Sequence, residues 1–259
     1  MKRIAGALIG GVAGWQALAY YTRSSYSAAI DRQIQRTLDD QGNAVQPTMA
    51  VGSIEDTVAD TLQTGDLVFF GQRCSLKLPC DSLHCALTKA ALDSSRFNHV
   101  GIVICKGPGL EPYVLEASCG GNVSLRPYSE RVLRSASPLI YVHPVRFQRT
   151  QEMVKRFESF SEEAVERSQQ ASVLASVGAI AARVVSNATQ ARRDRSEPPG
   201  IIADAPQSHA TALVLDALQS TGLLSEKVSA KRAVPEDLLG MRLQHGAAIR
   251  PAIIVRAWK

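Results

Sequence analysis

The order of hydrophobic and polar positions divides the chain into stretches of different character. Short apolar runs separated by turn-forming residues occupy the part between about residues 64 and 145. Such runs predict buried strands, whereas apolar positions recurring every three or four residues predict helices. We expect strands at residues 67–70, 100–105, 113–117, 139–145 and 252–257, and helices at 83–92, 151–193 and 210–224. This mixture, without an internal repeat, predicts an α+β fold.

The amino-terminal stretch, residues 4–21, carries no charge and is flanked by basic residues. At about 1.5 Å per residue, a helix of this length just spans the hydrocarbon of a bilayer. We therefore predict a single membrane anchor helix within residues 1–25, which would make the lipid bilayer a partner of the chain. A cleaved secretory signal, indicated by Ala17-Leu18-Ala19, and an apolar helix packed on the protein are the alternatives.

Three glycines of this stretch form a stripe along one side of the predicted helix. Gly6, Gly10 and Gly14 recur every four residues, which gives a doubled G-x-x-x-G pattern. Small residues in this spacing let a second membrane helix approach closely. The stripe predicts packing against a membrane helix of another subunit.

Beyond the anchor, we expect a helix and linker over residues 26–63 and a folded domain over 64–259. Within that domain, a helical insertion is expected at about residues 149–200. It reads as one long helix or a helical pair, polar nearly all round in its first part and rich in apolar residues over 171–185. An apolar helix surface has to be covered, by the chain's own domain or by another subunit. We expect the following residues to be buried and, in part, to contact a partner chain: Val173, Leu174, Val177 and Ile180.

Composition and charge argue against nucleic-acid binding. The 259 residues are 45% hydrophobic and carry a net charge of +5, but aromatic residues make up only 5%. Basic residues form no stripe apart from Arg192-Arg193-Asp194-Arg195. We therefore expect no nucleic-acid partner.

The cysteines indicate neither a disulfide framework nor a metal site. The chain has five cysteines, an odd number, at irregular spacing, whereas a disulfide framework needs cysteines in pairs. A group comprising Cys74, Cys80, His84 and Cys85 resembles a zinc site, but it lacks any C-x-x-C pair and a second pair of ligands. We expect no metal and no cofactor.

One pair of residues has the chemistry of an active site. His99 begins a predicted buried strand, and Glu116 lies on the next strand along the chain. A histidine held by a carboxylate is suited to act as a general base. A purely structural histidine is the alternative.

The segments around this pair resemble the permuted branch of the papain-like NlpC/P60 superfamily. The resemblance rests on Thr64-Gly65-Asp66-Leu67-Val68-Phe69-Phe70, Asn98-His99-Val100-Gly101-Ile102-Val103-Ile104 and Val114-Leu115-Glu116-Ala117, in that order. It implies a small antiparallel sheet packed on helices and a Cys–His–polar triad, as in the related amidases and lipid acyltransferases. It covers residues 64–145 and 208 to the end.

The resemblance places the nucleophile position at Ala210. Leu213-Val214, Ala217-Leu218 and Gly222-Leu223-Leu224 fall where the family has its pattern after the nucleophile, and Val234-Pro235-Glu236-Asp237 resembles its following proline turn. Alanine has no nucleophilic atom, and no cysteine lies beyond residue 119.

The sequence therefore predicts a pseudoenzyme, with His99 and Glu116 as remnants of the site. If the scaffold has outlived the reaction, we expect His99 to lie near both Glu116 and the Ala210 methyl group. A membrane-anchored, acid-poor amino terminus fits a supernumerary subunit of a mitochondrial inner-membrane complex, of the respiratory chain or the ATP synthase, whose other subunits are its partners. The alternatives are an active amidase or acyltransferase that uses Ser208 or Cys119, and a module that keeps the cleft for a lipid or peptide.

Overall fold

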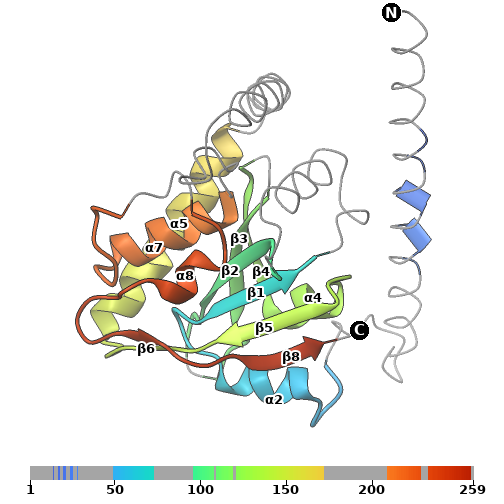
Figure 1. The fold of residues 1–259 in the computed structure, drawn as a ribbon, viewed down its shortest axis with the longest axis horizontal. Coiled ribbons are helices and arrows are strands. Elements are labelled where there is room, and N and C mark those ends of the chain that lie inside the picture. Colours follow the sequence, from blue (N-terminus) through green and yellow to red (C-terminus); the bar gives the residue numbers. More distant parts are fainter. Residues whose placement is uncertain are drawn as a thin grey trace, which may run out of the picture.

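The computed structural model describes residues 49–72, 96–107, 109–118, 121–171, 209–228 and 233–257, with scattered positions between 14 and 28. Its centre is a six-stranded sheet in the order β4-β3-β2-β1-β5-β8, in which all neighbouring strands are antiparallel (Figure 1). The strands are β1 (Leu67–Gly71), β2 (His99–Ile104), β3 (Tyr113–Ala117), β4 (Val123–Pro127), β5 (Leu139–His143) and β8 (Ile253–Ala257). A second, two-stranded sheet pairs β6 (Val145–Arg146) with β7 (Ala248–Ile249). The predicted α+β class, with an antiparallel sheet packed on helices, is confirmed.

Helices cover both faces of the large sheet. They are α2 (Ile54–Thr61), α4 (Tyr128–Leu133), α5 (Gln151–Ala171), α7 (His209–Ser220) and α8 (Asp237–Gly240). The helices α5 and α7 pack against each other and against β2, and α5 also covers β4 at one edge of the sheet. The helices α2 and α4 pack against each other, α2 against β8 and α4 against β3 and β4.

Two buried clusters identify which face each strand residue belongs to, because successive side chains of a strand point to opposite faces. We call one side the α7 face; its sheet residues, which pack with α7, include Leu67, Phe69, Val100, Ile102 and Leu115. We call the other side the α4 face; its residues, which pack with Tyr128 and Val132 of α4 and Val58 of α2, include Val68, Phe70, Val103 and Val114. The sheet thus separates two distinct cores.

The helix α5 differs from the expectation of a segment polar nearly all round. Phe157, Ser161 and Ala164 are buried at helical spacing, and Met153, Phe160 and Val165 pack beside them against the α7-face core. The charged residues occupy the remaining surface of the helix and conceal this narrow apolar stripe in the sequence. The first half of the predicted insertion therefore packs on its own domain.

The sequence did not predict β4, α2 and α4, nor the short elements α8 and β7. Edge strand β4 is only partly buried, so its apolar pattern is weak. Helix α2 begins after Ser53, whose side chain accepts a hydrogen bond from the Asp56 backbone N–H at 3.2 Å. This N-cap is the sequence signal that marks α2. Its packing brings Met49, Val58 and Leu62 into the α4-face core, so the packed domain extends to residue 49.

Several predictions concern residues outside those that the structure describes. They include the helix at 83–92, the zinc-like cysteine group, Ser208, Cys119 and the four apolar residues Val173, Leu174, Val177 and Ile180. Of the uncharged stretch at 4–21, only Gly14, Ala17, Tyr20 and Tyr21 are described, all of them helical, whereas Gly6 and Gly10 are not. Among the helices that the structure does describe, none has the length and hydropathy needed to cross a membrane.

Candidate functional site

The predicted histidine and carboxylate meet in the structure. His99 is the first residue of β2, and its Nε2 lies 2.7 Å from Oε2 of Glu116 on the neighbouring strand β3. Both side chains are buried, with 8% and 6% of the residue exposed. Gly101 keeps this part of the sheet close-packed, because a Cβ at that position would lie 2.5 Å from Val114 Cγ1. The pairing expected from the order of the strands is present.

Arg131 of α4 is a third member of the site, which the sequence did not indicate. Its Nε donates to both oxygens of Glu116, at 2.7 and 2.8 Å. The guanidinium lies over the ring of Phe70, 4.0 Å from its centre, and that ring in turn is 5.8 Å from the imidazole of His99. Because α4 itself was not predicted, nothing in the local pattern marked Arg131 as a partner.

The negative charge of the buried Glu116 carboxylate is compensated by its neighbours. Burial by itself raises the pKa of the Glu116 carboxyl, but the Arg131 charge and the His99 hydrogen bond outweigh that effect. The pKa of Glu116 is therefore held well below its usual range, and the carboxylate is ionised at neutral pH. His99, Glu116 and Arg131 form a buried charged network on the α4 face, which we call the Glu116 network.

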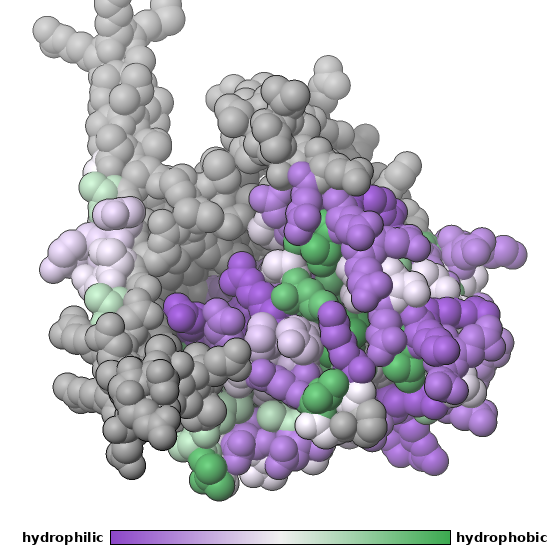
Figure 2. Space-filling view, turned by 180° about the vertical axis from the view of Figure 1, so that it is seen from behind, coloured by the Kyte–Doolittle hydropathy of each residue, from purple (hydrophilic) through white to green (hydrophobic). Residues whose placement is uncertain are grey.

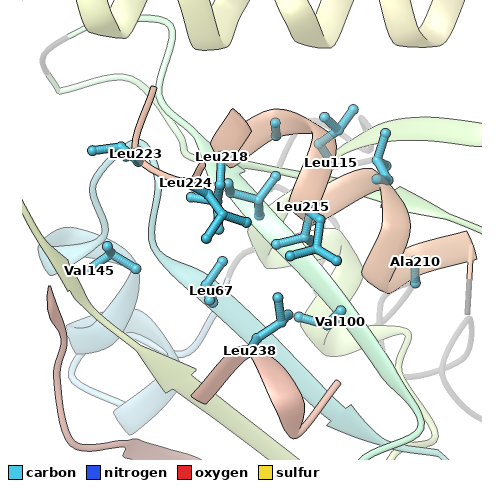
Figure 3. Close-up of a cluster of buried hydrophobic side chains, with 14 of the residues drawn as sticks. Leu67, Val100, Leu115, Val145, Ala210, Leu215, Leu218, Leu223, Leu224 and Leu238 are labelled. Atoms are coloured by element: carbon cyan, nitrogen blue, oxygen red, sulfur yellow. The ribbon is translucent and has the colours of Figure 1, made fainter. Parts of the chain in front are cut away.

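Ala210, in the predicted nucleophile position, lies on the other side of the sheet. It is the second residue of α7, is 3% exposed and belongs to the α7-face core together with Val100 and Leu115. Figure 3 shows Ala210 among the buried side chains between α7 and the sheet. His99 and Val100 are successive residues of β2, so their side chains point to opposite faces. The expected proximity of His99 to the Ala210 methyl group is therefore wrong: the sheet lies between them.

The first motif of the resemblance serves a structural purpose. Asp66 is buried and accepts hydrogen bonds from the backbone N–H groups of Gln63 and Val145 and from Arg149, each at 2.9 Å. Burial raises the pKa of Asp66, against the opposing effect of these partners. Gly65 adopts a φ of 95°, which favours glycine, and the Phe147 ring fills the space where a Cβ would stand. This corner ties the start of β1 to the segment that leads into α5.

The described residues of the site form no arrangement suited to a metal ion. Among the residues that the structure describes, no group of three or more histidine, cysteine, aspartate and glutamate side chains is placed to hold an ion. The Glu116 network holds α4 on the sheet through a bifurcated, charge-assisted hydrogen bond from Arg131 Nε to both oxygens of Glu116. It presents a fixed carboxylate and an imidazole, but in this arrangement the imidazole faces away from α7.

Comparisons with known proteins add little. No protein-family model matches the chain, and no curated protein matches it. Among solved structures, the chain is similar to the crystal structure described as metalloprotein yiiX from Escherichia coli O157:H7, at 15% sequence identity and a TM-score of 0.36. That similarity covers 76% of this chain and 97% of the other. It is a weak likeness.

Proposed function

We propose that this protein is a catalytically inactive, papain-like domain that serves as a membrane-anchored structural subunit of a larger complex. The proposal includes the anchor helix at residues 4–21 and a mitochondrial inner-membrane location, both of which rest on the sequence. The papain-like part rests on the order of the motifs quoted above, together with an antiparallel sheet that carries a helix on its α7 face.

The observation that carries the proposal is the separation of the nucleophile position, Ala210, from the paired His99 and Glu116. Nucleophilic catalysis of this class needs the attacking atom within hydrogen-bond reach of its base. Ala210 supplies no such atom, and it is buried on the face of the sheet opposite His99. A thiol introduced there would lie across the sheet from the His99 imidazole.

The state of Glu116 supports the same conclusion. In a catalytic triad the third residue orients the histidine while the histidine serves the nucleophile. Here the carboxylate is bound through both oxygens by Arg131, and His99 is the additional contact. This is the pattern of a structural ion network that holds α4 against β3.

The decisive experiment restores the missing thiol. We expect the Ala210→Cys variant of the full-length chain in mild detergent to react with iodoacetamide at residue 210 no faster than an ordinary buried thiol, measured by peptide mass spectrometry. The added change His99→Ala should leave that rate unaltered. A rapid reaction at neutral pH that is lost with His99→Ala would show that the imidazole activates position 210 and would overturn the proposal.

The structural-subunit part has its own test. The tagged wild-type chain, extracted from its native membrane in mild detergent, should migrate with other proteins in fixed proportion on a native gel. Migration as an isolated chain under conditions that preserve known membrane complexes would contradict it. The rival enzymes that use Ser208 or Cys119 predict labelling by serine- or thiol-directed activity probes that is abolished by His99→Ala.

A further inference from the structure

A cavity of about 740 Å³ lies at the end of the sheet opposite to the Glu116 network. Thr64 before β1, Cys105 after β2 and Pro112 before β3 border it, whereas His99 stands at the other end of β2. The helices α2 and α5 also contribute side chains to it. The cavity is of the size that small ligands and short peptide segments occupy.

Part of the cavity wall is apolar. Met49 and Leu62 are buried members of the α4-face core that also line the cavity, and Leu110 is 60% exposed at it. The other apolar residues of the lining are Val51, Ala59, Pro112 and Val154. An aliphatic group that enters here would exchange contact with water for contact with these apolar side chains.

Four carboxylates lie in the rest of the cavity lining. The four carboxylates are those of Asp56 and Asp60 on α2, Glu158 on α5, and Glu111. Asp56 accepts the backbone N–H of Gly52 at 2.8 Å, and Glu111 accepts hydrogen bonds from the N–H and hydroxyl of Ser129. Within the part of the chain that the structure describes, none of the four forms an ion pair.

The one basic side chain in the described lining is already occupied. Arg149 donates to Asp66 at 2.9 Å, to the Val145 carbonyl at 2.8 Å and to the Thr64 carbonyl at 3.0 Å, and its guanidinium lies over the Phe147 ring. Its charge is therefore offset by Asp66, which does not line the cavity. The described lining presents an excess of negative charge beside an apolar wall.

We propose that this cavity binds an amphipathic cation, an ammonium or guanidinium group carried on an aliphatic body. The aliphatic part would contact Leu62, Leu110 and Val154, and the cation would lie among the carboxylates of Asp60 and Glu158. An anionic ligand would be repelled, and a purely apolar one would leave the carboxylates without a counter-ion. Two sources carry this chemistry: a free alkylamine and a lysine or arginine side chain of a peptide segment. The inference goes beyond the proposed function and does not rest on it.

The face in Figure 2 is largely hydrophilic, with small hydrophobic areas lying apart from one another among the described residues. The cavity combines an apolar wall with negatively charged side chains, and this combination favours a ligand that is both aliphatic and positively charged.

The test uses the full-length chain in non-ionic detergent and two cationic probes, hexylammonium and the peptide acetyl-Leu-Lys-Leu-amide, with hexanol as the neutral counterpart. We expect both cations to bind in calorimetric titrations, more weakly at high salt, and hexanol to bind much less. The double variant Asp60→Asn, Glu158→Gln should weaken cation binding about tenfold. Val154→Arg, which places a guanidinium in the cavity, should abolish binding.

The matched control is Glu162→Gln, an exposed position one turn further along α5 that does not line the cavity. It should bind as the wild type does, and because all variants share the same detergent, uptake of probe by micelles cancels. Binding of the peptide alone would assign the site to a protein segment, and binding of hexylammonium alone to a free amine. Absence of binding by both, equal binding of hexanol, or unchanged binding in the double variant would overturn the inference.

Discussion

At the scale of single residues, Glu116 decides what the candidate site is. A buried carboxylate is costly unless opposite charge and hydrogen bonds compensate it. Arg131 approaches both oxygens, and His99 adds a contact at 2.7 Å. The group is therefore more sensitive to the loss of one member than to the loss of a matched pair.

Removing one charge of the network should destabilise the fold strongly. We expect Glu116→Gln and Arg131→Met each to lower the free energy of unfolding by about 3 kcal/mol, because each leaves a buried charge without its partner. The double variant should cost less than the sum, since the two residues are in contact. Urea denaturation measures both quantities. The control Glu130→Gln removes an exposed charge of the same helix, paired with Arg134 at 3.3 Å, and should change stability by at most about 0.5 kcal/mol.

The same network predicts an acid-dependent loss of stability. The pKa of Glu116 is depressed by folding from a usual 4.5, so its contribution is fully present above that value and declines as the pH falls below it. Asp66 acts in the opposite direction, because burial raises its pKa in the folded state. The comparison is made in a His99→Gln background, which removes the neighbouring imidazole that titrates in this range. There the free energy of unfolding, measured from about pH 7 to about pH 4, should fall less when Glu116→Gln is added than when Glu116 is kept. Parallel curves for the two proteins would contradict this assignment.

At the scale of elements, α5 and α7 form one layer on the α7 face of the sheet. The helix α7 contributes Ala210, Val214, Leu215 and Leu218 to the core, and α5 adds Phe157. This packing buries the apolar side of α7, including Ala210, the position at which a catalytic residue would have to be accessible to substrate. The first half of α5 is thus an integral part of the domain.

A substitution in α5 tests that packing. We expect Phe157→Ala to lower the free energy of unfolding by about 3–5 kcal/mol, because it removes a fully buried ring from the core. Glu162→Ala, on the exposed side of the same helix, should have little effect. Thermal unfolding followed by circular dichroism compares the two. A small effect of Phe157→Ala would mean that α5 is attached to the domain only loosely.

At the scale of the whole molecule, the proposal joins a folded domain to a membrane anchor. The described part of the packed domain starts at Met49, and the predicted anchor ends near residue 25. The amino-terminal glycine stripe is the part of the sequence that most directly implies a neighbour in the membrane.

The glycine stripe makes a prediction about assembly. Gly10→Leu should leave the domain folded and the chain in the membrane, yet reduce its recovery in the native complex, because a bulky side chain separates two close-packed helices. Blue-native electrophoresis of membranes that contain either protein gives the comparison. The matched control is Gly11→Leu, which makes the same change one residue along, about 100° round the predicted helix from the stripe. Equal recovery of Gly10→Leu and the wild type in the native complex would show that the glycine stripe is not part of an interface.

Much of the sheet is determined locally. The strands at 67–71, 99–104, 113–117, 139–143 and 253–257 and the helix at 209–220 agree with the sequence, because each is an apolar run or an apolar stripe bounded by turn residues. The contact between His99 and Glu116 also follows from the sequence, since strands joined by a short connection usually pair. The sequence could not indicate Arg131, because that contact exists only once α4 docks on the sheet, nor the apolar stripe of α5, which charged neighbours conceal.

Only the tertiary structure decided which side of the sheet each residue occupies. Whether Ala210 meets His99 depends on which face α7 covers, and α7 packs on the face of Val100 rather than that of His99. Side chains alternate along a strand, so a shift of a single residue exchanges the two faces, and a sequence motif does not specify that choice. The order of the motifs therefore determined the pairing of histidine and glutamate, whereas the packing of one helix determined that this pair stands apart from the position of the nucleophile.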